Sequence, residues 1–199
     1  MENKSLALFD FDGTITRKDT FLEFIKFTHG NLKFWFGMWL MSPLLILFKI
    51  KIIPNNKAKT FVLKYFYGGW PYEKFKKAGE DFCEQKLPAL IKPSALEQVK
   101  HHIKENHRVI LVTASAMEWV APWANKIGIE IISSQLEVKD EKITGRLGCP
   151  NCYGQEKVNR LKNVLVLEDY PAIYAYGDSS GDKQMLAASH HPHYRHFND

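Results

Sequence analysis

Cysteine is scarce in this chain of 199 residues, which has three, at positions 83, 149 and 152. Three cysteines are too few for a disulfide framework, and an odd number cannot all be paired within the chain. This favours a reducing compartment. The first eight residues contain only a short apolar run, so the long apolar core of a secretory signal peptide is missing. Apolar residues make up 45% and charged residues 25% of the chain, which argues against intrinsic disorder. We therefore expect a folded, cytoplasmic protein.

Acidic residues are absent from one long stretch. Residues 24–72 contain seven lysines and no Asp or Glu. The whole chain has a net charge of +5, so the remainder outside this stretch is slightly acidic. Because the basic character belongs to one segment, a general nucleic-acid surface is excluded and we expect no nucleic-acid partner.

A run long enough to span a membrane is also missing. The longest uncharged run, residues 34–48, reads FWFGMWLMSPLLILF and has fifteen residues. A spanning helix needs about 20 apolar residues, and Pro43 would break or kink a helix here. We expect a hydrophobic helical hairpin in this place.

The pattern of apolar and turn residues predicts an α/β protein with a helical insertion. Residues 5–11 form an apolar run that ends at Asp-Gly, which is typical of a strand. Helical patterns at 20–27, 57–67 and 72–85 follow. From residue 93 strands and helices alternate, as in a doubly wound sheet. The expected elements there are a helix to 106, a strand at 108–112, a helix to 127, a strand at 129–136, a hairpin at 137–147, a helix from 156 and a strand at 171–176. The histidine-rich end fits an edge strand or a frayed tail.

Four polar motifs fall at the expected carboxyl ends of strands or at a helix start, where an open α/β sheet binds its ligands. They are Asp10-Phe11-Asp12-Gly13-Thr14, Thr113, Lys157 and Gly177-Asp178-Ser179-Ser180-Gly181-Asp182. In this order they resemble the motifs of the haloacid dehalogenase superfamily, specifically its phosphoserine-phosphatase-like branch. The resemblance covers most of the chain. It implies a three-layer, doubly wound (Rossmann-like) α/β core from residues 1–16 and 93–199, with an inserted all-helical cap from residues 17–92.

The resemblance implies a phosphatase that hydrolyses phosphomonoesters through an aspartyl-phosphate. Asp10 would be the nucleophile, and Asp12 would protonate the leaving group. Thr113 would hydrogen-bond the phosphate, and Lys157 would neutralise Asp10 and the phosphoryl oxygens. The expected phosphate-binding residues are Gly13, Thr113, Ala114 and Lys157. Phosphotransfer to another alcohol and a binding module without turnover are the alternatives.

A cation is required because these carboxylates would repel a phosphate dianion. Oxygen ligands at such a site suit Mg²⁺, the expected cofactor. By resemblance, Asp10, the main-chain carbonyl of Asp12 and Asp178 would bind the metal, and Asp182 would orient these ligands.

The substrate class has two candidates. Asp19 lies nine residues after the nucleophile, where phosphoserine phosphatases carry an acid that meets the substrate amine. No arginine occurs between Arg17 and Arg108 to grip a carboxylate, and Lys57 or Lys59 would be only a point-charge substitute. A small metabolite of phosphoserine type is therefore weighed against a lipid phosphate such as phosphatidylglycerophosphate.

The apolar, basic segment at residues 32–53 supports the second candidate. Trp35, Trp39 and the lysines at 33, 49 and 51 have the composition of an interfacial anchor. The segment resembles the apolar insertion of phosphatidylglycerophosphatase C-type enzymes. Three interpretations stay open: a buried cap core, a dimer face, or contact with an anionic membrane that places the protein peripherally at the inner face of the membrane.

The pair Cys149 and Cys152 has the spacing of half a zinc site, but no second pair exists. We expect a loop here. Residues 152–157 match the Cys-x-Gly-x-Glu-Lys run of the resembled branch, which favours packing of Cys152 near Lys157.

Overall fold

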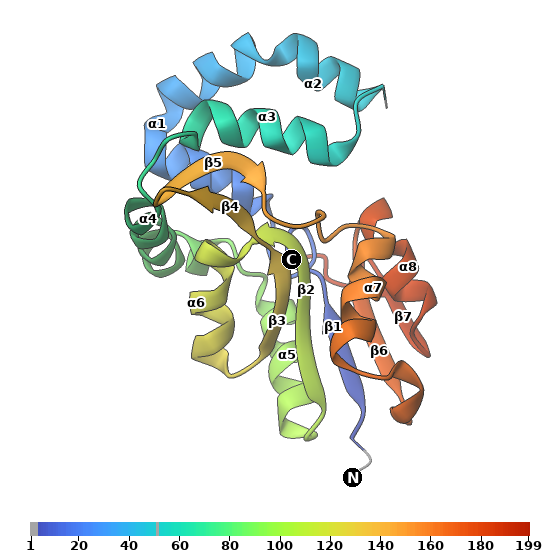
Figure 1. The fold of residues 1–199 in the computed structure, drawn as a ribbon. Coiled ribbons are helices and arrows are strands. Elements are labelled where there is room, and N and C mark those ends of the chain that lie inside the picture. The colour runs from blue at the N-terminus through green and yellow to red at the C-terminus, as the bar shows by residue number, and fades with distance from the viewer. Residues whose placement is uncertain (1–3, 51) are drawn as a thin grey trace.

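A five-stranded parallel sheet forms the centre of the computed structural model, which describes residues 4–50 and 52–199 (Figure 1). Its order is β3-β2-β1-β6-β7. The strands are Leu6–Phe9 (β1), Arg108–Ala116 (β2), Glu130–Ser134 (β3), Ile173–Gly177 (β6) and His191–Tyr194 (β7). Strand β1 pairs with β2 on one side and with β6 on the other, so that Phe9 lies opposite both Leu111 and Tyr176. The winding direction reverses between β1 and β6, and the crevice at the carboxyl ends of these strands is where such sheets bind ligands.

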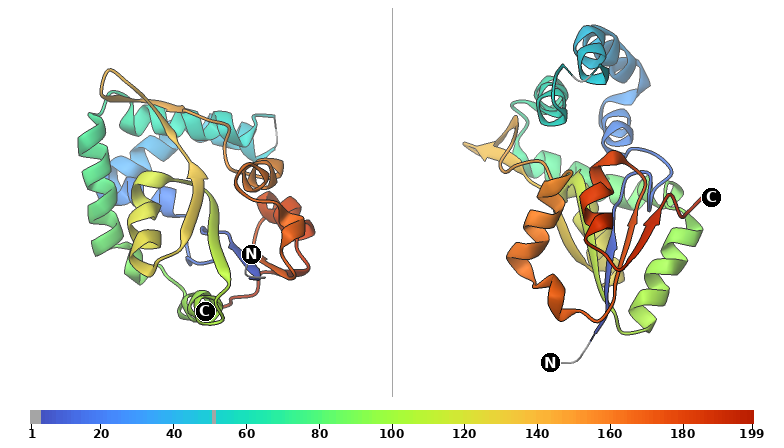
Figure 2. Two further views of the ribbon diagram at one scale, coloured as in Figure 1. Left: turned by 60° about the horizontal axis from the view of Figure 1, so that its bottom comes forward. Right: turned by 90° about the vertical axis from the view of Figure 1, so that its right-hand side faces the viewer.

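Each face of the sheet buries its own apolar core. Leu8 and Phe9 are adjacent in β1 and therefore point to opposite faces, and both are fully buried. Two helices cover each face (Figure 2): α5 (Pro93–Lys104) and α6 (Met117–Ile127) on the Phe9 side, α7 (Gln155–Val164) and α8 (Lys183–Ala187) on the Leu8 side. The predicted three-layer α/β fold is confirmed, although the short helix α8 was not predicted.

Further helices and a β-hairpin lie beyond the carboxyl end of the sheet (Figure 1). They are Thr20–Leu40 (α1), Ser42–Lys49 (α2), Asn55–Tyr67 (α3), Tyr72–Gln85 (α4), Leu136–Lys139 (β4) and Lys142–Leu147 (β5). Helix α1 bends at Gly30, whose φ of 75° costs glycine little. The hairpin packs closely on α3, because a Cβ on Gly145 would lie 2.4 Å from the Cα of Lys64. A two-stranded sheet thus joins the helices that were expected to form the cap alone.

The apolar segment differs in geometry from the expected helical hairpin. Helices α1 and α2 meet at a bend of 65°, so they do not fold back on each other. Pro43 lies in the first turn of α2, where its missing N–H and fixed φ suit a helix start. Within residues 4–50 and 52–199, no single helix is long and apolar enough to cross a membrane. Helices α1 and α2 taken together have the length and the hydropathy of a membrane span, but they are bent by 65° where they meet.

Two other boundaries depend on strand pairing. The strand expected at 129–136 is divided, because β3 ends at Ser134 and Leu136 pairs with Leu147 in the hairpin. The histidine-rich end forms the edge strand β7, which pairs with β6 and is one of the two expected alternatives. Apolar periodicity identifies a strand but not its partner, which is why the division was missed.

Candidate active site

The carboxyl ends of β1 and β6 bring three aspartates together. Asp10 directly follows β1, Asp178 directly follows β6, and Asp182 ends the short 3-10 turn after Asp178. One carboxylate oxygen of each lies within 4.8 Å of the other two. Clustered carboxylate oxygens are the ligands that hard divalent cations prefer, so this cluster is a candidate metal site.

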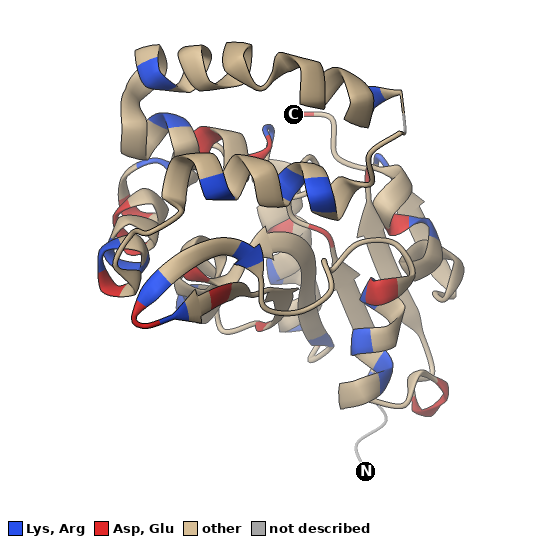
Figure 3. Ribbon diagram, turned by 45° about the horizontal axis from the view of Figure 1, so that its top comes forward, with Lys and Arg blue, Asp and Glu red and all other residues tan. Residues whose placement is uncertain are grey.

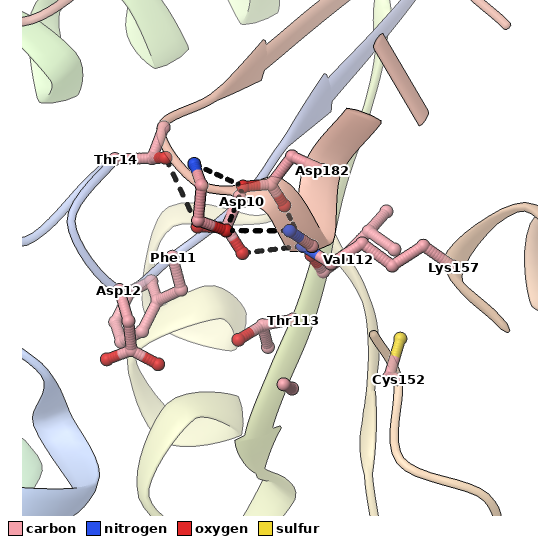
Figure 4. A network of polar contacts seen from close by, with 12 residues as sticks. Asp10, Phe11, Asp12, Thr14, Val112, Thr113, Cys152, Lys157 and Asp182 are labelled. Carbon is pink, nitrogen blue, oxygen red and sulfur yellow. Dashed lines mark hydrogen bonds and ion pairs between the residues drawn. The ribbon is translucent and has the colours of Figure 1, made fainter. Parts of the chain in front are cut away.

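Lys157 is the cation beside this cluster (Figure 4). Its ammonium group donates to Asp10 at 2.6 Å, to Asp182 at 2.7 Å and to the carbonyl of Val112 at 2.7 Å. The side chain is 1% exposed. Burial lowers the pKa of Lys157, but the charges and hydrogen bonds of Asp10 and Asp182 more than offset this effect and hold it above the ordinary value. The Lys157 ammonium group therefore places a positive charge at the buried end of the site.

Negative charge still exceeds positive charge around the three aspartates. Burial, opposed by Lys157, raises the pKa of Asp10 to about 7, and burial together with Asp182 raises the pKa of Asp178. A raised carboxyl pKa means that the charged form lacks compensation. A divalent cation would supply that compensation, and an all-oxygen donor set fits Mg²⁺.

Asp182 holds the loop that carries Asp178. Its Oδ2 accepts hydrogen bonds from the N–H of Ser179 at 3.0 Å and from the Ser179 hydroxyl at 2.8 Å, while its Oδ1 accepts from Lys157. Gly13 lies against the same loop with a φ of 83°, and a Cβ there would lie 2.3 Å from Oδ2 of Asp178. Glycine is therefore required for the loop after β1 to approach Asp178.

Asp12 is held by groups from the start of α1 and from the end of β2. Its Oδ1 accepts from the N–H and the hydroxyl of Thr20, both at 2.6 Å, and its Oδ2 accepts from the Ser115 hydroxyl at 2.5 Å. The sequence analysis missed Thr20 and Ser115. The available signal was the position of Ser115 two residues after Thr113, a spacing typical of one face of a strand.

Thr113 and Ala114 lie at the carboxyl end of β2. Thr113 is fully buried, and its hydroxyl oxygen accepts the N–H of Ser115 at 2.9 Å. The carbonyl of Ala114 accepts a hydrogen bond from Lys59 of helix α3. The predicted contacts of Thr113 and Ala114 with phosphate stay predictions.

A cavity of about 390 Å³ extends from the aspartates to the helices above them. Asp10, Asp12, Asp178, Asp182 and Lys157 line it at the core end. Its opposite wall includes Met38 from α1 with Leu45 and Phe48 from α2. Asn55 and Tyr153, which the sequence analysis did not single out, also line it, together with Ser179 of the last motif. The cavity is thus charged at one end and apolar at the other.

Two of the three expected substrate contacts lie in this cavity. Asp19 lines the cavity, and desolvation together with the charge of Asp12 raises its pKa to about 6. Burial lowers the pKa of Lys59, against the opposing effect of Asp12 and Asp19. Lys57 lies beside a separate depression with Phe61, because residues two apart on a helix do not share a face. The structure therefore does not bring Lys57 to the site.

The cysteine pair lies in a loop, as expected. Cys152 is buried in the core on the Leu8 side of the sheet, and burial raises the pKa of its thiol to about 11. The sulfur of Cys149 accepts a hydrogen bond from Arg160 at 3.1 Å. Over residues 4–50 and 52–199, neither cysteine belongs to a cluster of potential metal ligands.

Comparison with known proteins agrees with this geometry. The family model for haloacid dehalogenase-like hydrolases matches residues 7–187. Protein CicA of Caulobacter vibrioides is 34% identical over 96% of this chain and 86% of its own length. A probable phosphatase of Mycobacterium tuberculosis is 27% identical over 94% of this chain and 67% of its own. The structure of a phosphoserine phosphatase as a phospho-aspartyl intermediate analogue superposes with a TM-score of 0.61 at 22% identity, covering 94% of this chain and 84% of that one.

The family match spans most of the chain, and the fold match covers 94% of it. The predicted family and fold class are thereby confirmed, and the predicted enzyme type, a phosphatase of this superfamily, agrees with all of these findings. With Asp10, Lys157 and Asp178 meeting where β1 and β6 end, the chain belongs to the haloacid dehalogenase-like hydrolase family.

Proposed function

We propose that this protein is a Mg²⁺-dependent phosphomonoester hydrolase that works through an aspartyl-phosphate on Asp10. The observation that carries the proposal is the buried contact between Asp10 and Lys157, with Asp178 and Asp182 beside it and Asp12 held separately by Ser115. Two carboxylates in different surroundings suit two different roles. Asp10 is placed to attack and Asp12 to transfer a proton.

The chemistry follows from these placements. A carboxylate oxygen of Asp10 attacks phosphorus, and the bond from phosphorus to the ester oxygen breaks. Asp12 gives a proton to the departing alkoxide and then takes one from the water that hydrolyses the aspartyl-phosphate. Lys157 lies at 2.6 Å from Asp10 and compensates charge on the phosphoryl oxygens throughout. Asp10, Asp178 and the carbonyl of Asp12 would hold Mg²⁺, which would supply the remaining positive charge.

The cap helices set the choice of substrate. We assign residues 17–92 to the cap and residues 1–16 and 93–199 to the core, supported by the cavity wall that α1 and α2 contribute. Asp19, Asn55 and Lys59 are polar cap groups that line the cavity and are available to a substrate. Both a small metabolite of phosphoserine type and a lipid phosphate offer the required phosphomonoester. Contact of segment 32–53 with an anionic membrane or with a second copy of the chain belongs to the same question.

Magnesium dependence tests the proposal. We expect purified protein to hydrolyse p-nitrophenyl phosphate with Mg²⁺ and to lose activity in excess chelator, because the clustered carboxylates would otherwise repel the substrate. Asp178→Asn should raise the Mg²⁺ concentration for half-maximal activity by about tenfold or more. Asp169→Asn, an exposed site outside the cavity, is the matched control. Full activity in excess chelator contradicts the proposal.

The same assay distinguishes the two alternative functions. Phosphate transfer to added alcohols in place of water would favour the phosphotransferase alternative. Absence of turnover would favour the binding module.

Ser115→Ala should slow the hydrolysis of esters with poor leaving groups and spare those with good ones. The substitution removes the hydroxyl that holds Oδ2 of Asp12, while Thr20 still holds Oδ1, and proton donation matters most where the departing alkoxide is strongly basic. We expect kcat to fall about tenfold for an alkyl phosphate and to change little for p-nitrophenyl phosphate. An equal loss for both substrates would indicate a general defect instead of a misplaced acid.

A further inference from the structure

Exposed apolar side chains are concentrated on the cap helices. Among the described residues, twelve of the eighteen large exposed apolar side chains lie between positions 32 and 65. Trp35 and Trp39 are 65% and 70% exposed. Others on the same stretch include Leu32, Phe36, Ile46 and Ile50. Leu32, Trp35, Phe36 and Trp39 are spaced by three or four residues and therefore share one face of α1, and an exposed apolar face of this kind marks an interaction site more often than a free surface.

The charge on this face has one sign. The second half of α1, together with α2 and α3, carries lysines and no acidic residue, as Figure 3 shows. Lys33 and Lys49 are exposed at the two ends of the most apolar stretch, while Lys51 lies outside the described residues. Lysines beside exposed tryptophans are the composition of a surface that lies in the headgroup layer of an anionic bilayer.

Helices α1 and α2 are also apolar on the side that faces the cavity. Met38, Leu45 and Phe48 line the cavity that ends at the aspartates. Phe48 is partly exposed and belongs to the cavity wall, and its chain neighbours Ile46 and Ile50 are exposed outside that wall. A helix that is apolar all round needs an apolar partner on both sides.

A second copy of the chain fits this face less well than lipid does. In a symmetric dimer the face would meet itself, and the lysines of both copies would lie together with no acid within 24–72 to pair with them. An anionic surface instead complements every lysine on the face.

We propose that the outer face of α1, α2 and α3 docks on an anionic lipid bilayer, and that the cavity takes a phosphomonoester whose apolar chains stay against Met38, Leu45 and Phe48. This inference rests on the proposed phosphatase function for the reaction, and on the exposed face alone for the docking. The phosphate group reaches Asp10 at the charged end of the cavity. The bent α1–α2 pair lies in the interface instead of spanning it.

Vesicle binding tests the docking face. The full chain should co-sediment with vesicles of phosphatidylcholine mixed with phosphatidylglycerol, and weakly with phosphatidylcholine alone, with added salt reducing the difference. Lys33→Glu/Lys49→Glu and Trp35→Gln/Trp39→Gln should each weaken binding by about tenfold or more. Lys100→Glu/Lys104→Glu on α5 makes the same charge change on an exposed helix of the core and should bind like the unchanged protein.

Activity separates this inference from the proposed function. Phosphatidic acid in the anionic vesicles should be hydrolysed. Both cap variants should hydrolyse it about tenfold more slowly, or slower still, while keeping the rate on p-nitrophenyl phosphate.

The docking face is overturned if the cap and control variants sediment equally with vesicles. It is also overturned if the unchanged protein does not bind anionic vesicles at low salt. A dimer in lipid-free buffer that the cap variants convert to a monomer also overturns it. Binding without phosphatidic acid hydrolysis, when p-nitrophenyl phosphate is turned over, overturns the lipid substrate. If the unchanged protein hydrolyses neither phosphatidic acid nor p-nitrophenyl phosphate, the result counts against the phosphatase function instead.

Discussion

Asp10→Asn should lower phosphatase turnover by about four orders of magnitude or more while the protein stays folded. The substitution removes the charged oxygen that attacks phosphorus, and removing a nucleophile leaves only the rate supported by binding and charge stabilisation. The amide oxygen can still accept a hydrogen bond from Lys157, and Asp182 remains as the other partner of that lysine. The measurement is kcat with saturating Mg²⁺, together with thermal unfolding of the same sample.

An acid-quench experiment provides a second readout for this variant. The unchanged protein, mixed with substrate and quenched in acid, should carry a phosphoryl group on the peptide that contains Asp10, and the variant should carry none. Asp140→Asn, in the exposed turn of the β4–β5 hairpin, is the matched control and should behave like the unchanged protein. Near-native rates for Asp10→Asn would refute covalent catalysis by this residue.

Lys157→Met should be the most destabilising single change at the site. Lys157 is almost fully buried between Asp10 and Asp182, and its removal leaves two carboxylates without their common partner. Breaking a buried ion pair by removing one partner costs about 3–5 kcal/mol. We expect the free energy of unfolding in urea without metal to fall by about that amount, and turnover to be lost.

Magnesium should recover part of the stability of Lys157→Met. A cation that binds the folded carboxylates and not the unfolded chain stabilises the fold by mass action. The gain in unfolding free energy with Mg²⁺ should therefore be larger for the variant than for the unchanged protein. Lys162→Met, an exposed change on the same helix α7, should alter stability by about 0.5 kcal/mol or less. A loss of similar size in Lys157→Met and Lys162→Met would show that the buried contacts of Lys157 contribute little.

The catalytic motifs were readable from the sequence because each one lies at the end of an element with a strong local pattern. The apolar run of β1 ends at Asp10, and the run of β6 ends immediately before Asp178. Parallel strands present their carboxyl ends at one edge of a sheet, so motifs about 170 residues apart in the chain had to converge once the strands were adjacent. Of the residues that hold Asp12, Ser115 had only its spacing from Thr113 as a signal and Thr20 had none, because their shared contact with one carboxylate depends on where α1 begins relative to β2.

The sequence by itself determined the α/β class, the order of the motifs, the family resemblance and the strongly basic, apolar character of one segment, since these depend on local composition and periodicity. Only the tertiary structure decided which side chains of that segment face outward, that Lys59 enters the cavity while Lys57 does not, that the strand expected at 129–136 divides into two, and that α1 and α2 meet at 65°. The physical reason is that a pattern shows that a helix or strand must bury a face, whereas the partner that covers the face is set by packing between segments distant in sequence. On the outer side of α1 and α2 no such partner is present among the described residues, and Trp35 and Trp39 stay exposed.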